Sequence, residues 1–221
     1  TQGENLKLFE EKICQYLGAR FSFGVCNATA ALEMASQLCC FKEGDEVVIP
    51  SHTFTSSAYP FAKKGAQIVW ADIDPQSKVV TANTLSDRIT AKTKAIVVVH
   101  LYGYGADMPE IMELAKRHRL LVVEDAAQAL GVKVEGKMAG TYGDFGIFSF
   151  HSHKNISTLG EGGVLAVKDE DVAALIPGLR HNGHCSFPFE REDYWLPAMG
   201  NVDFPQLNGQ NLGPNNYCIG E

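Results

Sequence analysis

Apolar positions follow two periods along most of the chain, one typical of helices and one typical of buried strands. Over residues 6–17 they recur every three or four positions, which predicts an amphipathic helix that ends at Gly18. Residues 95–100 (AIVVVH) are instead apolar at almost every position, as in a strand buried on both faces. The same criteria predict strands at 21–26, 46–49, 67–71, 120–124, 144–150 and 163–167, and helices at 28–40, 56–64, 84–89, 108–118 and 172–179.

This alternation of strand and helix predicts the fold class. Strands that are buried on both faces occur mainly in parallel sheets with helices on each side. We therefore expect an α/β fold with a mostly parallel sheet. Residues 181–213 have neither period and are rich in Gly, Pro, Asn and aromatic side chains, which predicts a long irregular loop.

Composition and charge limit the kinds of partner that the protein is expected to bind and the compartment in which it is expected. Lys and Arg number 19 against 26 Asp and Glu, a net charge of −7, which disfavours nucleic acid as a partner. The apolar runs are much shorter than the roughly 20 residues of a membrane helix. Six cysteines without a CxxC pair, and a polar start without a signal peptide, predict a cytoplasmic protein with reduced thiols. The missing initiator Met and the end at Glu221 are expected of a processed or partial chain.

Two charged residues follow apolar strands, where ligands of α/β sheets bind. Asp125 ends the run LVVED, so its carboxylate needs a cation or a protonated ring nitrogen nearby, or else it caps a helix over 126–130. Lys154 lies in a loop with His151 and His153, which we expect to line its pocket, and with three glycines at 160, 162 and 163 that would let backbone approach a bound group closely. It is either a solvated lysine or a nucleophile that forms a Schiff base with a carbonyl.

A phosphate site and a metal site can also be weighed. Asn27, Ala28 and Thr29 stand where a strand gives way to a helix, so they either bind phosphate through free N–H groups or simply cap the helix. No GxGxxG or GxxxxGK[ST] motif offers a rival phosphate site. His181, His184 and Cys185 lack a second ligand pair at zinc spacing, so we expect no metal site.

Five segments in a fixed order resemble the DegT/DnrJ/EryC1/StrS sugar aminotransferases, which are pyridoxal phosphate (PLP) enzymes of fold type I. The segments are NATAALEMA (27–35), GDEVVIPSHTFTSSA (44–58), VVHLYG (98–103), VVEDAAQALG (122–131) and GDFGIFSFHSHKNISTLGEGG (143–163). The resemblance implies that residues 1–221 are the PLP-binding large domain, with 181–221 irregular and a smaller C-terminal domain absent.

The resemblance also implies a role for each matching residue. Lys154 would be the Schiff-base lysine and Asp125 the partner of the pyridine nitrogen, which makes both catalytic. The remaining cofactor-binding residues would contact the phosphate, the ring face or the phenolic oxygen, and they are Ala28, Thr29, Ser149, Phe54 and Gln128. Asn216 would reach the phosphate of the partner subunit in a homodimer. The chain departs from the family at Asn27 and Ala28, where Ser-Gly is usual, and at Cys218, where Arg is common.

The implied activity is transfer of an amino group from glutamate or glutamine to the keto group of a nucleotide-linked sugar or a cyclitol. Two alternatives remain at this point. A non-catalytic fragment would keep the fold without using the cofactor. A family dehydratase acting on a keto-deoxysugar would carry His in place of the Schiff-base lysine, whereas this chain has Lys154. The segment 187–211 is either an acceptor- or subunit-contacting loop or a packed surface loop.

Overall fold

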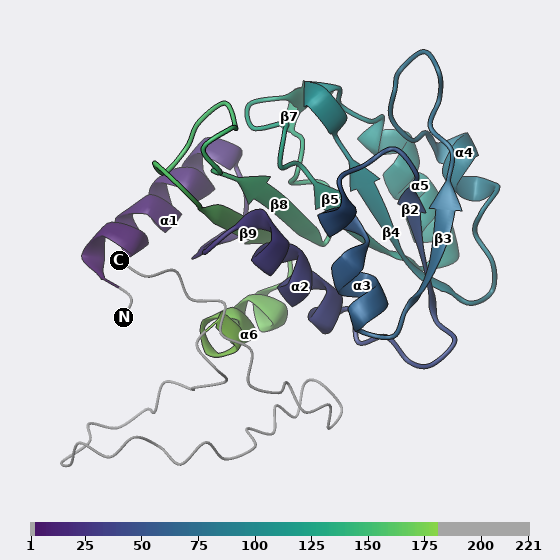
Figure 1. The fold of residues 1–221 in the computed structure, drawn as a ribbon, viewed down its shortest axis with the longest axis horizontal. Coiled ribbons are helices and arrows are strands. Elements are labelled where there is room, and N and C mark those ends of the chain that lie inside the picture. The colour runs from purple at the N-terminus through teal and green to yellow at the C-terminus, as the bar shows by residue number, and fades with distance from the viewer. Residues whose placement is uncertain (1–2, 181–221) are drawn as a thin grey trace.

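The computed structural model describes residues 3–180, which form a seven-stranded sheet covered by helices on both faces (Figure 1). The strand order is β1-β9-β8-β5-β4-β2-β3, and β9 runs antiparallel to its neighbours β1 and β8 while the other paired strands are parallel. The strands are β1 (Phe21–Val25), β2 (Glu46–Pro50), β3 (Gln67–Ala71), β4 (Thr93–Val99), β5 (Leu121–Asp125), β8 (Phe145–Ser149) and β9 (Gly163–Val167). The expected mostly parallel α/β fold is confirmed.

The helices follow the predicted order with shifted boundaries. They are α1 (Glu4–Leu17), α2 (Ala28–Leu38), α3 (Tyr59–Lys63), α4 (Ala82–Ser86), α5 (Met108–His118) and α6 (Glu170–Arg180), with 3₁₀ turns η1 (Thr55–Ser57) and η2 (Leu101–Gly103). The single helix predicted over 56–64 is wrong, because η1 and α3 divide this segment. A small hairpin of β6 (Lys133–Val134) and β7 (Lys137–Met138) was not predicted.

Each face of the sheet has its own apolar layer, and the alternation of side chains along the strands separates the two. In β4, Val97 and Val99 pack in the layer beneath α2, α3 and α6, whereas Ile96 and Val98 pack toward α4 and α5. Helix α1 covers β8 and β9 on the second face. The middle strands are therefore buried on both sides, as their uninterrupted apolar runs predicted.

Strand direction positions the site. Because β1, β2, β4, β5 and β8 are mutually parallel, their carboxyl ends meet at one edge of the sheet. Helix α2 begins directly after β1 at this edge, so its amino end faces the same region. Ligands of open α/β sheets bind at such an edge.

Candidate active site

A cavity of about 440 Å³ opens at the carboxyl ends of these strands. It is large enough to hold a small cofactor together with part of a substrate. Seven of the eight residues that the sequence assigned to the site line it: Ala28, Thr29, Phe54, Asp125, Gln128, Ser149 and Lys154. The structure thus brings together residues from four separate segments of the chain, although their individual roles remain predictions.

The amino end of α2 forms one wall. Asn27 accepts a hydrogen bond from Ala30 N–H through Oδ1 at 2.9 Å, so it is the helix cap considered from the sequence. Ala28 and Thr29 occupy the first turn, where N–H groups have no intrahelical acceptor. The Thr29 hydroxyl donates to Ser56 Oγ at 2.9 Å. This wall therefore offers N–H groups, hydroxyls and the positive end of a helix dipole, a combination that binds phosphate.

We expected the glycines that follow Lys154 to let backbone approach a bound group, whereas Gly163 allows close backbone packing within the protein. A Cβ added to Gly163 would lie 2.5 Å from Asn27 C and 2.7 Å from Ala28 N. Gly163 therefore lets the start of β9 approach the start of α2 backbone to backbone, which fixes the helix end at the cavity. Around Gly160 the structure leaves open space, so nothing there requires glycine.

Asp125 ends β5 and is 6% exposed. No helix follows it, so the alternative of a helix cap over 126–130 is wrong: these residues form turns. Its Oδ1 accepts from Ala127 N–H at 3.2 Å, and its Oδ2 accepts from the Ser57 hydroxyl at 2.6 Å. Burial raises the pKa of Asp125, and the hydrogen bond from Ser57 opposes this effect. A buried carboxylate that faces a cavity is suited to bind a protonated group there.

Lys154 lies in the loop between β8 and β9, half-buried, and its N–H donates to His151 O at 2.9 Å. It lies close enough to Asp125 for its positive charge to lower the pKa of that carboxyl. His151 and His153 line the same cavity, as expected, with their ring centroids 4.9 Å apart. Glu161 lies 3.5 Å from His151 Nε2. The lysine therefore stands among groups that can accept or donate protons.

Gln128 and Phe54 lie at the opening of the cavity and offer contacts to a ligand. Gln128 Oε1 accepts from Tyr102 N–H at 2.9 Å, which leaves its amide nitrogen to donate to another oxygen. Tyr102 adopts a left-handed backbone with φ of 54°, an uncommon conformation that this hydrogen bond helps to hold. The Phe54 ring is 69% exposed and lines the cavity, so one of its faces is available to a planar ligand.

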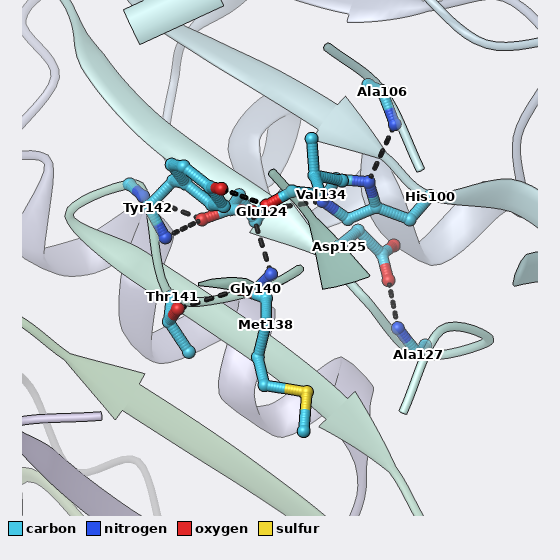
Figure 2. Close-up of polar contacts among 11 residues, drawn as sticks. His100, Ala106, Glu124, Asp125, Ala127, Val134, Met138, Gly140, Thr141 and Tyr142 are labelled. Atoms are coloured by element: carbon cyan, nitrogen blue, oxygen red, sulfur yellow. Dashed lines mark hydrogen bonds and ion pairs between the residues drawn. The ribbon is translucent and has the colours of Figure 1, made fainter. Parts of the chain in front are cut away.

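Behind the cavity, His100 and Glu124 form a buried pair (Figure 2). Glu124 Oε1 accepts from Tyr142 and Gly143 N–H, both at 2.6 Å, and Oε2 accepts from Gly140 N–H at 2.7 Å. Ala106 N–H donates to His100 Nδ1 at 3.2 Å, so the ring proton lies on Nε2, 3.0 Å from Glu124 Oε2. Four donors thus satisfy the Glu124 carboxylate, and His100 forms a fixed wall of the cavity.

Several lining residues were not assigned from the sequence: Thr53, Ser56, His100 and Glu161. His100 follows β4 directly, so the rule that identified Asp125 after β5 would also have identified it. Asn216 and the candidate zinc residues His181, His184 and Cys185 lie outside the described residues. Within residues 3–180 no group of three or more His, Cys, Asp or Glu could hold a metal ion, and no helix has the length and hydrophobicity to cross a membrane.

Comparison with known proteins places this site in a family context. The model of the DegT/DnrJ/EryC1/StrS aminotransferase family matches residues 1–201. A GDP-perosamine synthase of Caulobacter vibrioides is 42% identical over 192 residues, covering 87% of this chain and 50% of its own length. A UDP-N-acetyl-3-dehydro-alpha-D-glucosamine 3-aminotransferase of Acidithiobacillus ferrooxidans is 38% identical over 218 residues, covering 96% and 59%. The chain spans about half the length of these curated relatives.

Solved structures agree. The aminotransferase from Psychrobacter cryohalolentis superposes with a TM-score of 0.83 at 30% identity, covering 98% of this chain and 53% of its own. The E. coli GDP-4-keto-6-deoxy-D-mannose-3-dehydratase with bound hydrated PLP gives 0.79 at 26%, covering 83% and 48%. The fold is that of the large domain of PLP enzymes of fold type I. Because the family model matches most of the sequence, the chain belongs to the DegT/DnrJ/EryC1/StrS aminotransferase family.

Proposed function

We propose that the protein catalyses PLP-dependent transfer of an amino group from an amino acid, glutamate or glutamine, to the keto group of a nucleotide-linked sugar or a cyclitol. The observation that carries this proposal is the cavity itself. A lysine, a buried carboxylate and the amino end of a helix all border it, at separate positions along its wall.

The chemistry of the donors fits PLP. The amino end of α2, with Ala28, Thr29 and Ser149, offers N–H and hydroxyl groups for a phosphate. Phe54 offers a ring face for stacking, and the free amide nitrogen of Gln128 can donate to a phenolic oxygen. Asp125 supplies the buried negative charge that a protonated pyridine nitrogen requires. When bound, PLP supplies a carbonyl that bonds to amines and a ring that withdraws electrons.

Lys154 and Asp125 then divide the proton chemistry between them. Asp125 holds a proton on the ring nitrogen, which keeps the ring electron-deficient. The ε-amine of Lys154 would hold the cofactor through its carbonyl, and Lys154 Nζ would move a proton as the general base when a substrate amine is bound. His151, His153 and Glu161 provide further proton-exchanging groups within the same cavity.

The substrate class rests on the family relatives. Their names describe a GDP-perosamine synthase and an aminotransferase for a 3-dehydro sugar nucleotide, so an activated keto sugar is the acceptor best supported. Dehydration is the second candidate, since three of the solved structural neighbours are structures of a dehydratase. The presence of Lys154 favours transamination over dehydration, in which the resemblance assigns His to this position.

We also propose that residues 1–221 provide the cofactor-binding large domain of a cytoplasmic homodimer. Two strongly exposed aromatic side chains border the cavity region, Phe54 at 69% and Tyr102 at 70%, as is typical of protein interfaces. No disulfide joins the cysteines among residues 3–180.

Absorbance spectroscopy tests the cofactor assignment. The purified protein incubated with PLP is expected to develop a visible band that free PLP lacks, and borohydride reduction should fix PLP on Lys154. Addition of glutamate or glutamine should convert the band, and subsequent addition of a GDP- or UDP-linked keto sugar should restore it with formation of an amino sugar. A protein without the band is the non-catalytic fragment, and release of water rather than amination identifies the dehydratase.

A further inference from the structure

Ser57 is a fully buried polar residue at the end of η1, and no role was assigned to it from the sequence. Its hydroxyl has two partners. It donates to Asp125 Oδ2 at 2.6 Å, and it lies 2.7 Å from Thr53 Oγ1. A buried serine with two short hydrogen bonds, one of them to a carboxylate in the cavity, is more constrained than packing alone requires.

The chemistry of these groups fixes the direction of both hydrogen bonds. An ionised carboxylate can only accept, so the single proton of the Ser57 hydroxyl goes to Asp125. Ser57 Oγ can then only accept from its other neighbour, and the Thr53 hydroxyl must be the donor. The result is a directed chain of hydroxyls that ends on the Asp125 carboxylate.

We propose that Ser57 is a positioning residue, whose hydroxyl, oriented by Thr53, holds Oδ2 of Asp125 and keeps this carboxylate ionised and aimed into the cavity. The inference rests on the proposed function, in which Asp125 pairs with the ring nitrogen of PLP. Neighbouring residues of η1 thereby serve both ends of the site: Ser56 bonds Thr29 at the start of α2, and Ser57 bonds Asp125. A single short turn sets the separation of the phosphate end from the carboxylate.

The charges around Asp125 explain why it needs such a donor. Burial raises its pKa, and among the opposing effects the hydrogen bond from Ser57 is the largest, followed by that from Ala127 N–H. Lys154 in the β8–β9 loop adds a smaller opposing effect through its positive charge, whereas His100 at the end of β4 is neutral because its Nδ1 accepts from Ala106 N–H. The neighbouring Glu124 points to the other face of the sheet, where four donors satisfy it. Without Ser57, burial would favour the neutral acid.

The test measures Asp125 directly in the protein without PLP. Carbon-13 NMR of aspartate side-chain carboxyls gives the titration midpoint of each, and the signal lost in Asp125→Asn identifies the relevant one. Ser57→Ala is expected to raise this midpoint by about one pH unit, as loss of a hydrogen bond to a charged group requires. Thr53→Val should raise it less, because it removes only the donor that orients Ser57. Ser57→Thr, which retains the hydroxyl, should restore the wild-type midpoint.

Ser36→Ala is the matched control. Ser36 is also fully buried and makes one hydrogen bond, to Glu33 O at 2.8 Å on α2, so its loss should leave the Asp125 midpoint unchanged. An unchanged midpoint in Thr53→Val and Ser57→Ala, or in Thr53→Val alone if the Ser57 variant does not fold, overturns the proposal. If the midpoints shift as expected but PLP forms no visible band with the wild type, the proposed function fails and the positioning of the carboxylate stands.

Discussion

Asp125 combines a charge and a buried position, and this combination has a cost that can be measured. In the unfolded chain the carboxyl titrates near 3.8, whereas burial in the folded protein raises its pKa. The destabilisation is therefore absent below pH 3.8, where the group is neutral in both states, and complete above the folded pKa, where it is charged in both. The buried Asp125 carboxylate that faces the cavity therefore lowers the free energy of unfolding.

Asp125→Asn should remove the cost together with the activity. We expect the free energy of unfolding of the variant, measured by urea denaturation without PLP, to gain on the wild type as pH rises from about 4 to 7. In the presence of PLP it should retain the cofactor but lose turnover by about a hundredfold or more, because an amide cannot hold the ring nitrogen protonated. Asp87→Asn, at an exposed carboxylate, is the control. Unchanged turnover would remove Asp125 from the catalytic site.

In the proposed function Lys154 acts in the chemistry, whereas its position as a half-buried loop residue means that it adds little to the core. Lys154→Ala should therefore abolish the visible band of bound PLP and the borohydride-fixed adduct, while the unfolding midpoint changes little. Lys133→Ala, at an exposed lysine in β6, should retain both signals. A borohydride-stable adduct that persists in the Lys154 variant would show that another amine binds the cofactor.

At the scale of single residues, the sequence identifies site residues that directly follow a buried strand, but not those that a turn positions. Asp125 was found because an apolar run precedes it, and His100 was open to the same argument. Ser57 was not, because the direction of its hydroxyl depends on the single 3₁₀ turn of η1, which no period in the sequence encodes. The expectation that Ala28 and Thr29 begin a helix beside the cavity followed from a strand-to-helix boundary, a local signal, and their role toward a phosphate stays a prediction.

Among the secondary-structure elements, β5 contributes both to the cavity and to the buried polar cluster behind it, because its last two residues point to opposite faces of the sheet. Asp125 faces the cavity, while Glu124 receives three backbone N–H groups from residues 140–143 and the ring of His100 at the end of β4 (Figure 2). Glu124 thus ties the turn before β8 and the end of β4 to β5. The cavity wall depends on this buried carboxylate, which does not itself face the cavity.

The substitution Glu124→Gln tests whether Glu124 holds the turn before β8 and the end of β4 against β5. An amide keeps the shape but turns one acceptor oxygen into a donor that faces existing N–H donors, so we expect a loss of about 3 kcal/mol in the free energy of unfolding. Denaturant titration without PLP measures the loss, and Glu113→Gln, at an exposed carboxylate of α5, should lose less than 0.5 kcal/mol, within the roughly ±0.5 kcal/mol typical of surface changes. Equal stability of the Glu124 variant and the wild type would show that the turn is held by other contacts.

Boundaries of elements were predicted less well than their order, for local reasons. The sequence interpretation started a helix at Thr84, whereas α4 begins at Ala82, because Thr81 and Thr84 form a reciprocal capping box. It joined 56–64 into one helix, whereas Ala58 ends η1 and Pro60 enters the first turn of α3. Neither error moved β5, which ends at Asp125, or β8 and β9, which flank the loop that carries Lys154.

At the scale of the whole molecule, the main feature is how much of its relatives' length the chain covers. The chain spans about half the length of its curated relatives, and the described residues already form the cavity. Its lining includes Phe54 and Gln128, the latter bonded to the backbone of Tyr102, and both Phe54 and Tyr102 are strongly exposed. A second copy of the chain at this mouth would cover those rings and, in the proposed homodimer, bring Asn216 to the phosphate of its partner.

A shared site makes cofactor affinity depend on protein concentration. If each subunit completes the other's phosphate site, PLP stabilises the dimer and the dimer tightens PLP binding by the same factor. We expect sedimentation across a dilution series to show dissociation at higher protein concentration without PLP than with it. Asn216→Ala should weaken PLP binding by about tenfold, as loss of one hydrogen bond to a charged group predicts, and should reduce the effect of PLP on dissociation. A monomer that binds PLP equally well at every concentration would contradict the shared site, because then one chain holds the phosphate with its own α2 and Ser149 alone.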